Sequence, residues 1–207
     1  YGPGSDGRPG YAESEGVAAG SRTETFAALR LQFENWRWAG TPFYLRSGKR
    51  MAEKRTEVVI QFKPPAANLF RKLPITAEAR RLEPNRLVFS VAPHEALSLR
   101  FESKRPGMGI RVDPVEMMAT LDRDPGEPVV EAYGPLIIDA MRGDQTLFKS
   151  RIEVESAWDA VMPFLDASSA PAREDIQGNY APGSWGPESA RELLARNGRR
   201  WYEEERS

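Results

Sequence analysis

The stretch 35–55 reads NWRWAGTPFYLRSGKRMAEKR and is the most informative part of this chain. It places two Trp, a Phe and a Tyr beside a turn that, together with Arg46 just before it, carries two Lys and three Arg. Aromatic side chains bury large apolar areas, so they can fix the backbone next to the turn. A backbone fixed in this way can hold cations where an anionic ligand binds. We therefore expect a rigid, positively charged turn between two strands.

Strands are predicted on both sides of this turn. Residues 25–33 alternate between two faces, with Leu29 and Leu31 on one and Arg30 and Gln32 on the other, which is typical of a half-buried strand. Further strands are predicted at residues 42–46, 56–62, 86–91, 97–101, 109–112 and 115–121. So many short strands in succession, with tight connections, favour a largely antiparallel sheet.

The last third of the chain changes to helical periodicity. Helices are predicted at residues 131–141, from just after Ser150 to Leu165, and at residues 187–198. Ser150 and Glu153 have the spacing of a capping box at the start of the second helix. Strands followed by helices predict an α+β domain, a large and mainly antiparallel β-sheet with helices packed on one face. The other face is then expected to meet solvent or another subunit.

The composition is that of an ordinary soluble globular protein of one domain, with 207 residues, 40% hydrophobic and 29% charged. The 29 basic and 30 acidic residues nearly balance, which argues against nucleic acid or a membrane surface as the main partner. The absence of Cys excludes disulfides and thiolate chemistry. No apolar run is long enough to span a bilayer and segment 1–21 lacks the apolar core of a signal peptide, so we expect a cytoplasmic location. Segment 1–21 is predicted to be a loop or linker before a domain at 22–207.

No catalytic, cofactor-binding or metal-binding residue is predicted on this chain. His94 is the single His and follows Pro93 in a predicted turn, so we expect it to be exposed rather than catalytic. One His without Cys does not supply the ligands of a transition-metal site. The run Gly2-Pro3-Gly4-Ser5-Asp6-Gly7 has the letters of a dinucleotide-binding loop, but no predicted strand precedes it and no helix follows it. Asp139 and Asp144 are expected to cap or ion-pair the first helix.

Lys49 and Lys54 are the candidate ligand-binding residues. Gly48 permits a tight turn, and the two Lys flank a short excursion between two predicted strands. Two ammonium groups that reach one pocket from such a turn can bind a phosphate. The alternative is a solvated basic hairpin, because exposed charged runs are common on protein surfaces. From the residues alone, both interpretations stay open.

An ordered series of motifs along the chain resembles one known family. The first group is Glu34-Asn35-Trp36-Arg37-Trp38, Gly40, Pro42-Phe43, Leu45-Arg46, Gly48-Lys49 and Lys54. The later motifs, in chain order, are Gln61-Phe62, Asn85-Arg86-Leu87-Val88, Pro93-His94-Glu95, Glu131-Ala132-Tyr133, Asp139-Ala140, Gly143-Asp144-Gln145-Thr146-Leu147-Phe148, Ala157-Trp158 and Gly183-Ser184-Trp185-Gly186-Pro187. From about Tyr11 onward, the chain resembles the C-terminal domain of glucose-6-phosphate dehydrogenase.

This resemblance implies a part of an NADP-dependent enzyme that oxidises glucose 6-phosphate to 6-phosphogluconolactone in the pentose phosphate pathway. In the family, an N-terminal Rossmann domain binds NADP and carries the catalytic Asp-His pair. Neither has a match in this sequence, so the chain alone is expected to be inactive. The family's C-terminal domain carries part of the sugar-phosphate site and the dimer interface. The implied partners are therefore glucose 6-phosphate and a second copy bound through the sheet face, and Lys49 and Lys54 match the family's substrate-binding cations.

Two positions depart from the family's pattern. Ala92 stands where many members have a Gln near the substrate, so that hydrogen bond is not expected here. Met118 stands where members with a second, structural NADP have an Asp, and a second NADP site is therefore not predicted. The alternative to a part of this enzyme is a non-catalytic module that self-associates or binds a sugar phosphate.

Overall fold

A computed structural model describes residues 1–5, 7–21, 23–64, 83–108, 112–121, 133–165 and 179–202. The chain forms two compact units, one made of Tyr1–Asp122 with Gly178–Ser207 and the other of Arg123–Gln177. Parts of the predicted elements lie outside the described residues, namely 109–111 and 131–132. The predicted division into segments 1–21 and 22–207 stays a prediction.

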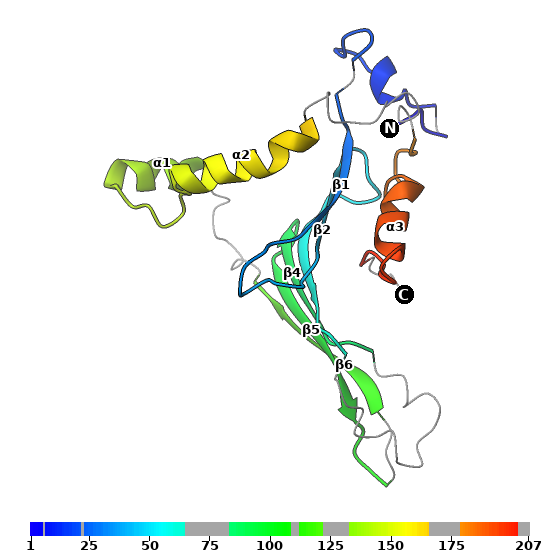
Figure 1. Ribbon diagram of the computed structural model, residues 1–207, viewed down its shortest axis with the longest axis vertical. Helices are drawn as coiled ribbons and strands as arrows, with labels where there is room; N and C mark the ends of the chain where they lie inside the picture. Colours follow the sequence, from blue (N-terminus) through cyan, green and yellow to red (C-terminus); the bar gives the residue numbers. More distant parts are fainter. Residues whose placement is uncertain are drawn as a thin grey trace, which may run out of the picture. The chain divides into compact units, whose positions relative to one another are not determined.

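The first unit contains an antiparallel four-stranded sheet in the order β3-β4-β5-β6 (Figure 1). Its strands are β3 (Thr56–Gln61), β4 (Arg86–Ala92), β5 (Ala96–Lys104) and β6 (Val112–Thr120). The register aligns Val58 with Phe89, Phe89 with Leu97, and Leu97 with Ala119. Because side chains alternate along a strand, this row and its neighbours define one apolar face. The apolar face comprises Val58, Ile60, Leu87, Phe89, Leu97, Leu99, Phe101, Val115, Met117 and Ala119.

The opposite face of this sheet is polar along much of its length. Ser98 donates a hydrogen bond of 2.6 Å to the Glu116 carboxylate on the adjacent strand. Arg100 lies 3.6 Å from the Glu102 carboxylate. The contrast between the two faces follows from the alternation of side chains along each strand, and it leaves large apolar side chains such as Met117 more than half exposed.

A two-stranded antiparallel sheet also belongs to the first unit. Strand β1 (Phe26–Leu31) pairs with β2 (Phe43–Gly48), so that Leu29 lies opposite Leu45. Helix α3 (Glu188–Ala195) contacts β1 and lies beside it (Figure 1). Ala190 and Leu194 of this helix are 3% exposed and, within the described parts of the chain, share the buried apolar core with Val88 and Tyr180.

The predicted α+β class is confirmed, but the predicted single large sheet is divided into these two sheets. The division falls where β2 ends at Gly48. Arg50 then bends the chain with a φ of 52°, and Met51 forms a parallel bridge with Ser184. After β2, the Arg50 carbonyl and the Ala52 N–H are hydrogen-bonded to Gly183 and Ser184. The chain between β2 and β3 is therefore bonded to a distant segment and not to another strand. Helix α3 is the predicted helix that belongs to the first unit, and it contacts β1.

The second unit contains two helices, α1 (Tyr133–Arg142) and α2 (Arg151–Leu165). The predicted capping box is present, because the Ser150 N–H donates to the Glu153 carboxylate at 2.8 Å and the Glu153 N–H donates to the Ser150 hydroxyl at 3.3 Å. Gly143, with a φ of 74°, ends α1 as the sequence predicted. Both predicted helices of this region are thus confirmed over their described residues.

Candidate functional site

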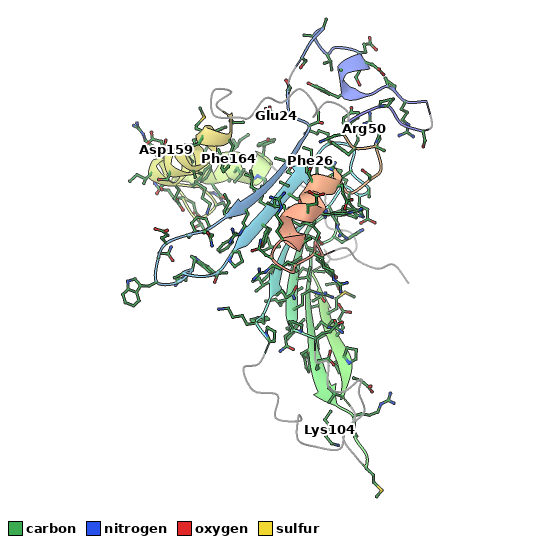
Figure 2. The ribbon with its side chains drawn as sticks, turned by 45° about the vertical axis from the view of Figure 1, so that its right-hand side comes forward. Glu24, Phe26, Arg50, Lys104, Asp159 and Phe164 are labelled. Atoms are coloured by element: carbon green, nitrogen blue, oxygen red, sulfur yellow. The ribbon has the colours of Figure 1, made fainter. Side chains whose placement is uncertain are left out.

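The connection between β2 and β3 carries both predicted ligand-binding residues. It runs through Lys49 and Lys54, whose side chains are exposed. No ion pair or side-chain hydrogen bond of either ammonium group is found with the residues that the structure describes. Figure 2 shows Arg50, which belongs to this connection, near Phe26 of β1, whereas Lys104 lies at the far end of the four-stranded sheet. The role of the two Lys as a pair that binds one anion stays a prediction.

The first half of this connection is held by a segment from near the end of the chain, residues 180–186, which we call the anchor segment. Its Gly183 N–H donates to the Arg50 carbonyl oxygen at 2.8 Å. Its Ser184 carbonyl accepts a hydrogen bond of 2.9 Å from the Ala52 N–H. The Lys49 N–H donates to the Thr25 carbonyl at 2.8 Å, just before β1. The backbone around Lys49 is therefore bonded on both sides to other parts of the unit.

Two glycines allow the turn and the anchor segment to approach Phe26 closely. A Cβ atom at Gly48 would lie 2.7 Å from a carbon of the Phe26 ring and 2.9 Å from the Met51 sulfur. A Cβ atom at Gly186 would overlap the same ring, and the φ of Gly186 is 102°, a conformation that other residues rarely adopt. The Phe26 ring thus occupies space that side chains at these two positions would need.

Two arginines next to the lysines are held against aromatic rings. The Arg46 guanidinium carbon lies 5.0 Å from the centre of the Trp185 ring and 4.6 Å from that of Trp201. The Arg55 guanidinium carbon lies 4.7 Å from the centre of the same Trp185 ring. Such cation–π contacts, at these distances, favour a fixed guanidinium position. Trp201 is itself fixed, because its indole N–H donates to the Ala190 carbonyl at 2.8 Å.

The surroundings of Lys54 are set by Arg55. This guanidinium pairs with Glu53 at 3.4 Å and with Glu57 at 3.2 Å, and its side chain is 12% exposed. Arg55 therefore forms ion pairs with the carboxylates on both sides of Lys54 in the sequence, whereas no ion pair of Lys54 is found with the described residues. The ammonium group of Lys54 keeps its charge available for an anionic ligand.

The aromatic residues at the turn differ from those that the sequence predicted. Trp36 is fully exposed, so the expectation that it helps to fix the backbone is wrong. Trp38 and Phe33 do pack edge-on against Phe43, with ring centres 5.2 and 5.0 Å apart, but at the far end of β2. The aromatic side chains at the turn itself are Phe26 from β1 and residues from the C-terminal part of the chain, such as Trp185. The signal of Trp185 in the sequence was the run Gly183-Ser184-Trp185-Gly186-Pro187, to which no contact could be assigned.

The other candidate residues have structural surroundings. His94 is exposed between β4 and β5, as predicted. Asp144 accepts hydrogen bonds from the Thr146 hydroxyl at 2.6 Å and the Thr146 N–H at 2.9 Å, and these bonds lower the pKa of its carboxyl. Gly2, Gly4 and Gly7 lie outside any described strand or helix. Among the described residues, no cluster of His, Cys, Asp and Glu could hold a metal ion, and no helix is long and apolar enough to cross a membrane.

Comparison with known proteins identifies the fold. Residues 2–202 match the family described as glucose-6-phosphate dehydrogenase, C-terminal domain. A glucose-6-phosphate 1-dehydrogenase of Mycolicibacterium smegmatis is 42% identical over 208 aligned residues, which cover 98% of this chain and 40% of that protein. The same enzyme of Aggregatibacter actinomycetemcomitans is 40% identical over 192 residues, which cover 93% of this chain and 37% of that protein.

Solved structures give the same result. A glucose-6-phosphate dehydrogenase in complex with its substrate glucose-6-phosphate superposes with a TM-score of 0.80 at 31% identity, over 98% of this chain and 40% of that one. The enzyme of Mycobacterium avium gives a TM-score of 0.72 at 32% identity, over 94% of this chain and 38% of that one. The chain thus spans about two fifths of the length of these proteins. It belongs to the family of glucose-6-phosphate dehydrogenase C-terminal domains.

Proposed function

We propose that this chain is the substrate-side domain of a glucose-6-phosphate dehydrogenase, in which Lys49 and Lys54 bind glucose 6-phosphate. The observation that carries the proposal is the exposed pair of lysines on a turn held to the anchor segment. The turn occurs in a domain whose solved neighbour is a complex with glucose 6-phosphate. A fixed turn with available ammonium groups suits an anionic sugar, because less conformational freedom is lost on binding.

The proposed reaction of the whole enzyme removes a hydride from C1 of the sugar and a proton from the C1 hydroxyl, which gives the lactone. NADP is the hydride acceptor in this proposal. Neither the base nor a nucleotide-binding loop is assigned to this chain. Its part is to hold the sugar phosphate so that C1 faces the acceptor, and positioning of this kind can contribute several kcal/mol to catalysis, on the order of 7 or more in favourable cases. The NADP preference, the cytoplasmic location and the inactivity of the chain alone stay predictions.

The test uses the full-length protein that contains this chain. Lys49→Ala and Lys54→Ala should each raise the KM for glucose 6-phosphate about 10- to 100-fold, because each removes a hydrogen bond to a charged ligand. Lys63→Ala is the matched control, since Lys63 is an exposed lysine just after β3 and should leave the KM unchanged. A double variant of Lys49 and Lys54 with the KM of the unmodified enzyme would contradict the assignment.

A second candidate function, self-association through the four-stranded sheet, is favoured by the apolar face. Phe89 and Met117 on this face are 40% and 59% exposed, and an exposed apolar patch of this kind marks an interface. A charge in its middle, as in Phe89→Glu, should shift the full-length protein toward monomer in sedimentation experiments. An unchanged oligomer with lower stability would instead mean that another part of the longer protein covers this face.

A further inference from the structure

We propose that the Tyr180 hydroxyl is a positioning group for Lys49, which it places by binding the backbone of that residue. This inference rests on the proposed role of Lys49 in binding glucose 6-phosphate. Tyr180 lies 131 positions from Lys49 in the sequence and does not touch the lysine side chain in any contact found here. Its effect on the substrate would be indirect, through the position of the Lys49 backbone.

The Tyr180 hydroxyl lies between two carbonyl groups. Its oxygen is 2.9 Å from the Lys49 carbonyl oxygen and 3.0 Å from the Thr25 carbonyl oxygen, to either of which it can donate its proton. The Thr25 hydroxyl lies 3.4 Å from the same phenol oxygen. Because the Thr25 carbonyl also accepts from the Lys49 N–H, the phenol completes a small network in which both backbone polar groups of Lys49 have a partner.

The Tyr180 ring is held in place independently of this network. Its side chain is among the buried apolar groups of the unit at 6% exposed. The ring centre lies 5.4 Å from that of Phe26, the residue that also fills the space beside Gly48 and Gly186. A ring fixed in this way sets the direction of its hydroxyl. A phenol with the ordinary pKa of 10.0 is protonated at neutral pH and can donate, and burial raises the pKa of Tyr180 further.

Backbone placement matters for a lysine in particular. The lysine side chain is long and flexible, and it loses conformational freedom when its ammonium group binds a ligand. A backbone that moves as well would add to this loss and would spread the ammonium group over more positions. The bonds from Tyr180 to Lys49 and from Gly183 to Arg50 fix two consecutive carbonyl groups of the turn. The remaining freedom then lies in the lysine side chain alone.

The test is Tyr180→Phe in the full-length enzyme, which removes one oxygen atom and keeps the ring. We expect the KM for glucose 6-phosphate to rise about 3- to 10-fold, with kcat within about twofold of the unmodified enzyme, because one buried hydrogen bond is lost. The matched control is Tyr44→Phe in the same unit. The Tyr44 hydroxyl is buried and has no hydrogen-bond partner in the described part of the chain, so its removal should leave the KM unchanged.

A double-mutant cycle separates a positioning role from a general structural one. In a Lys49→Ala background, Tyr180→Phe should raise the KM no further, because the residue through which it acts is gone. An equal KM increase with and without Lys49 would overturn the inference. A Tyr180→Phe variant with the same kinetics as Tyr44→Phe would also overturn the inference. The proposed function would still stand in that case if Lys49→Ala raised the KM. If Lys49→Ala leaves the KM unchanged, the proposed function fails and this inference fails with it.

A second measurement needs no variant of Tyr180 and covers the case in which that variant does not fold. Hydrogen exchange of the unmodified enzyme, with and without glucose 6-phosphate, reports on the amides of residues 49–52 and 180–186. Substrate binding to a turn coupled to the anchor segment should slow exchange in both peptides together. Slower exchange at 49–52 with no change at 180–186 would count against the coupling.

Discussion

Lys49 and Lys54 lie on the same connection between two strands, but different parts of the molecule set their surroundings. The backbone of Lys49 is held by Thr25 and by Tyr180, which are far away in the sequence. The surroundings of Lys54 are set by its immediate neighbours, through the Arg55 ion pairs with Glu53 and Glu57. One cation therefore depends on the tertiary structure for its position, and the other depends on local charge balance for its availability.

We therefore expect packing changes at the anchor segment to alter the position of Lys49. We expect charge changes near Arg55 to alter the binding of an anion by Lys54. Both lysines are exposed, so neither depends on its own burial. The following changes separate the two dependences, in order of decreasing expected effect.

The largest effect is expected for Gly186→Ala. The new Cβ would overlap the Phe26 ring, and the φ of 102° is unfavourable for alanine. We expect a loss of about 3–5 kcal/mol in the free energy of unfolding, from overpacking together with backbone strain. Thermal and denaturant unfolding measure it. Gly198→Ala is the control, because its φ is 64° but nothing lies within 4 Å of the new Cβ, and it should cost about 1–2 kcal/mol. Equal losses for the two variants would show that Phe26 does not fill this space.

Trp201→Leu should come next. It removes the indole hydrogen bond to the Ala190 carbonyl and the contact with Arg46. We expect a loss of about 2 kcal/mol in the free energy of unfolding. The KM for glucose 6-phosphate should hardly change, because Trp201 contacts neither the Lys49 turn nor the Glu53–Glu57 segment in any interaction seen here. A KM increase as large as that of Tyr180→Phe would show that Trp201 also positions the lysines.

Arg55→Gln tests the local dependence of Lys54. Without the guanidinium, Glu53 and Glu57 lose their ion pairs with Arg55 and can compete with the substrate for Lys54, so the KM for glucose 6-phosphate should rise about 3- to 10-fold. The triple variant Glu53→Gln, Arg55→Gln, Glu57→Gln should recover most of the affinity, since no carboxylate is left to compete. Failure of this rescue would mean that Arg55 acts through packing on Trp185 rather than through charge.

The smallest effect is expected at the capping box of α2, in the unit that does not contain the two lysines. The hydrogen bond from the Ser150 N–H, with a smaller contribution from the Ser150 side chain, lowers the pKa of the Glu153 carboxyl. A lowered pKa in the folded state contributes stability above the pKa of the unfolded state, and this contribution is lost as the pH falls through the folded value. The melting temperature of Glu153→Gln should therefore lie slightly below that of the unmodified protein at about pH 7 and converge with it toward about pH 3. A difference that grows toward acid would contradict the cap geometry.

Much of the fold was predictable because its determinants are local. Alternating side chains located β1, and the Ser150 and Glu153 pair located the start of α2. The turn with Lys49 and Lys54 was predictable from its Gly48 and its charges. The anchor segment was not, because its bonds join the backbone of Arg50 and Ala52 to residues more than 130 positions away and leave no periodic pattern.

The division of the sheet and the role of Tyr180 were missed for the same reason. Backbone hydrogen bonds between distant segments do not depend on side-chain type, so the sequence carries little record of them. A single Tyr in a Gly- and Pro-rich run looks like any other aromatic residue until its hydroxyl is placed between two carbonyl groups. The close approach of Phe26 explains the glycines at 48 and 186 only once the three are seen together.

The most direct test of this account is a crystal structure of the full-length protein with glucose 6-phosphate bound. We predict that the ammonium nitrogens of Lys49 and Lys54 both lie about 2.7–3.2 Å from oxygens of the sugar phosphate, with the Tyr180 hydroxyl still bonded to the Lys49 carbonyl. A sugar phosphate bound at a site that neither lysine reaches would contradict it.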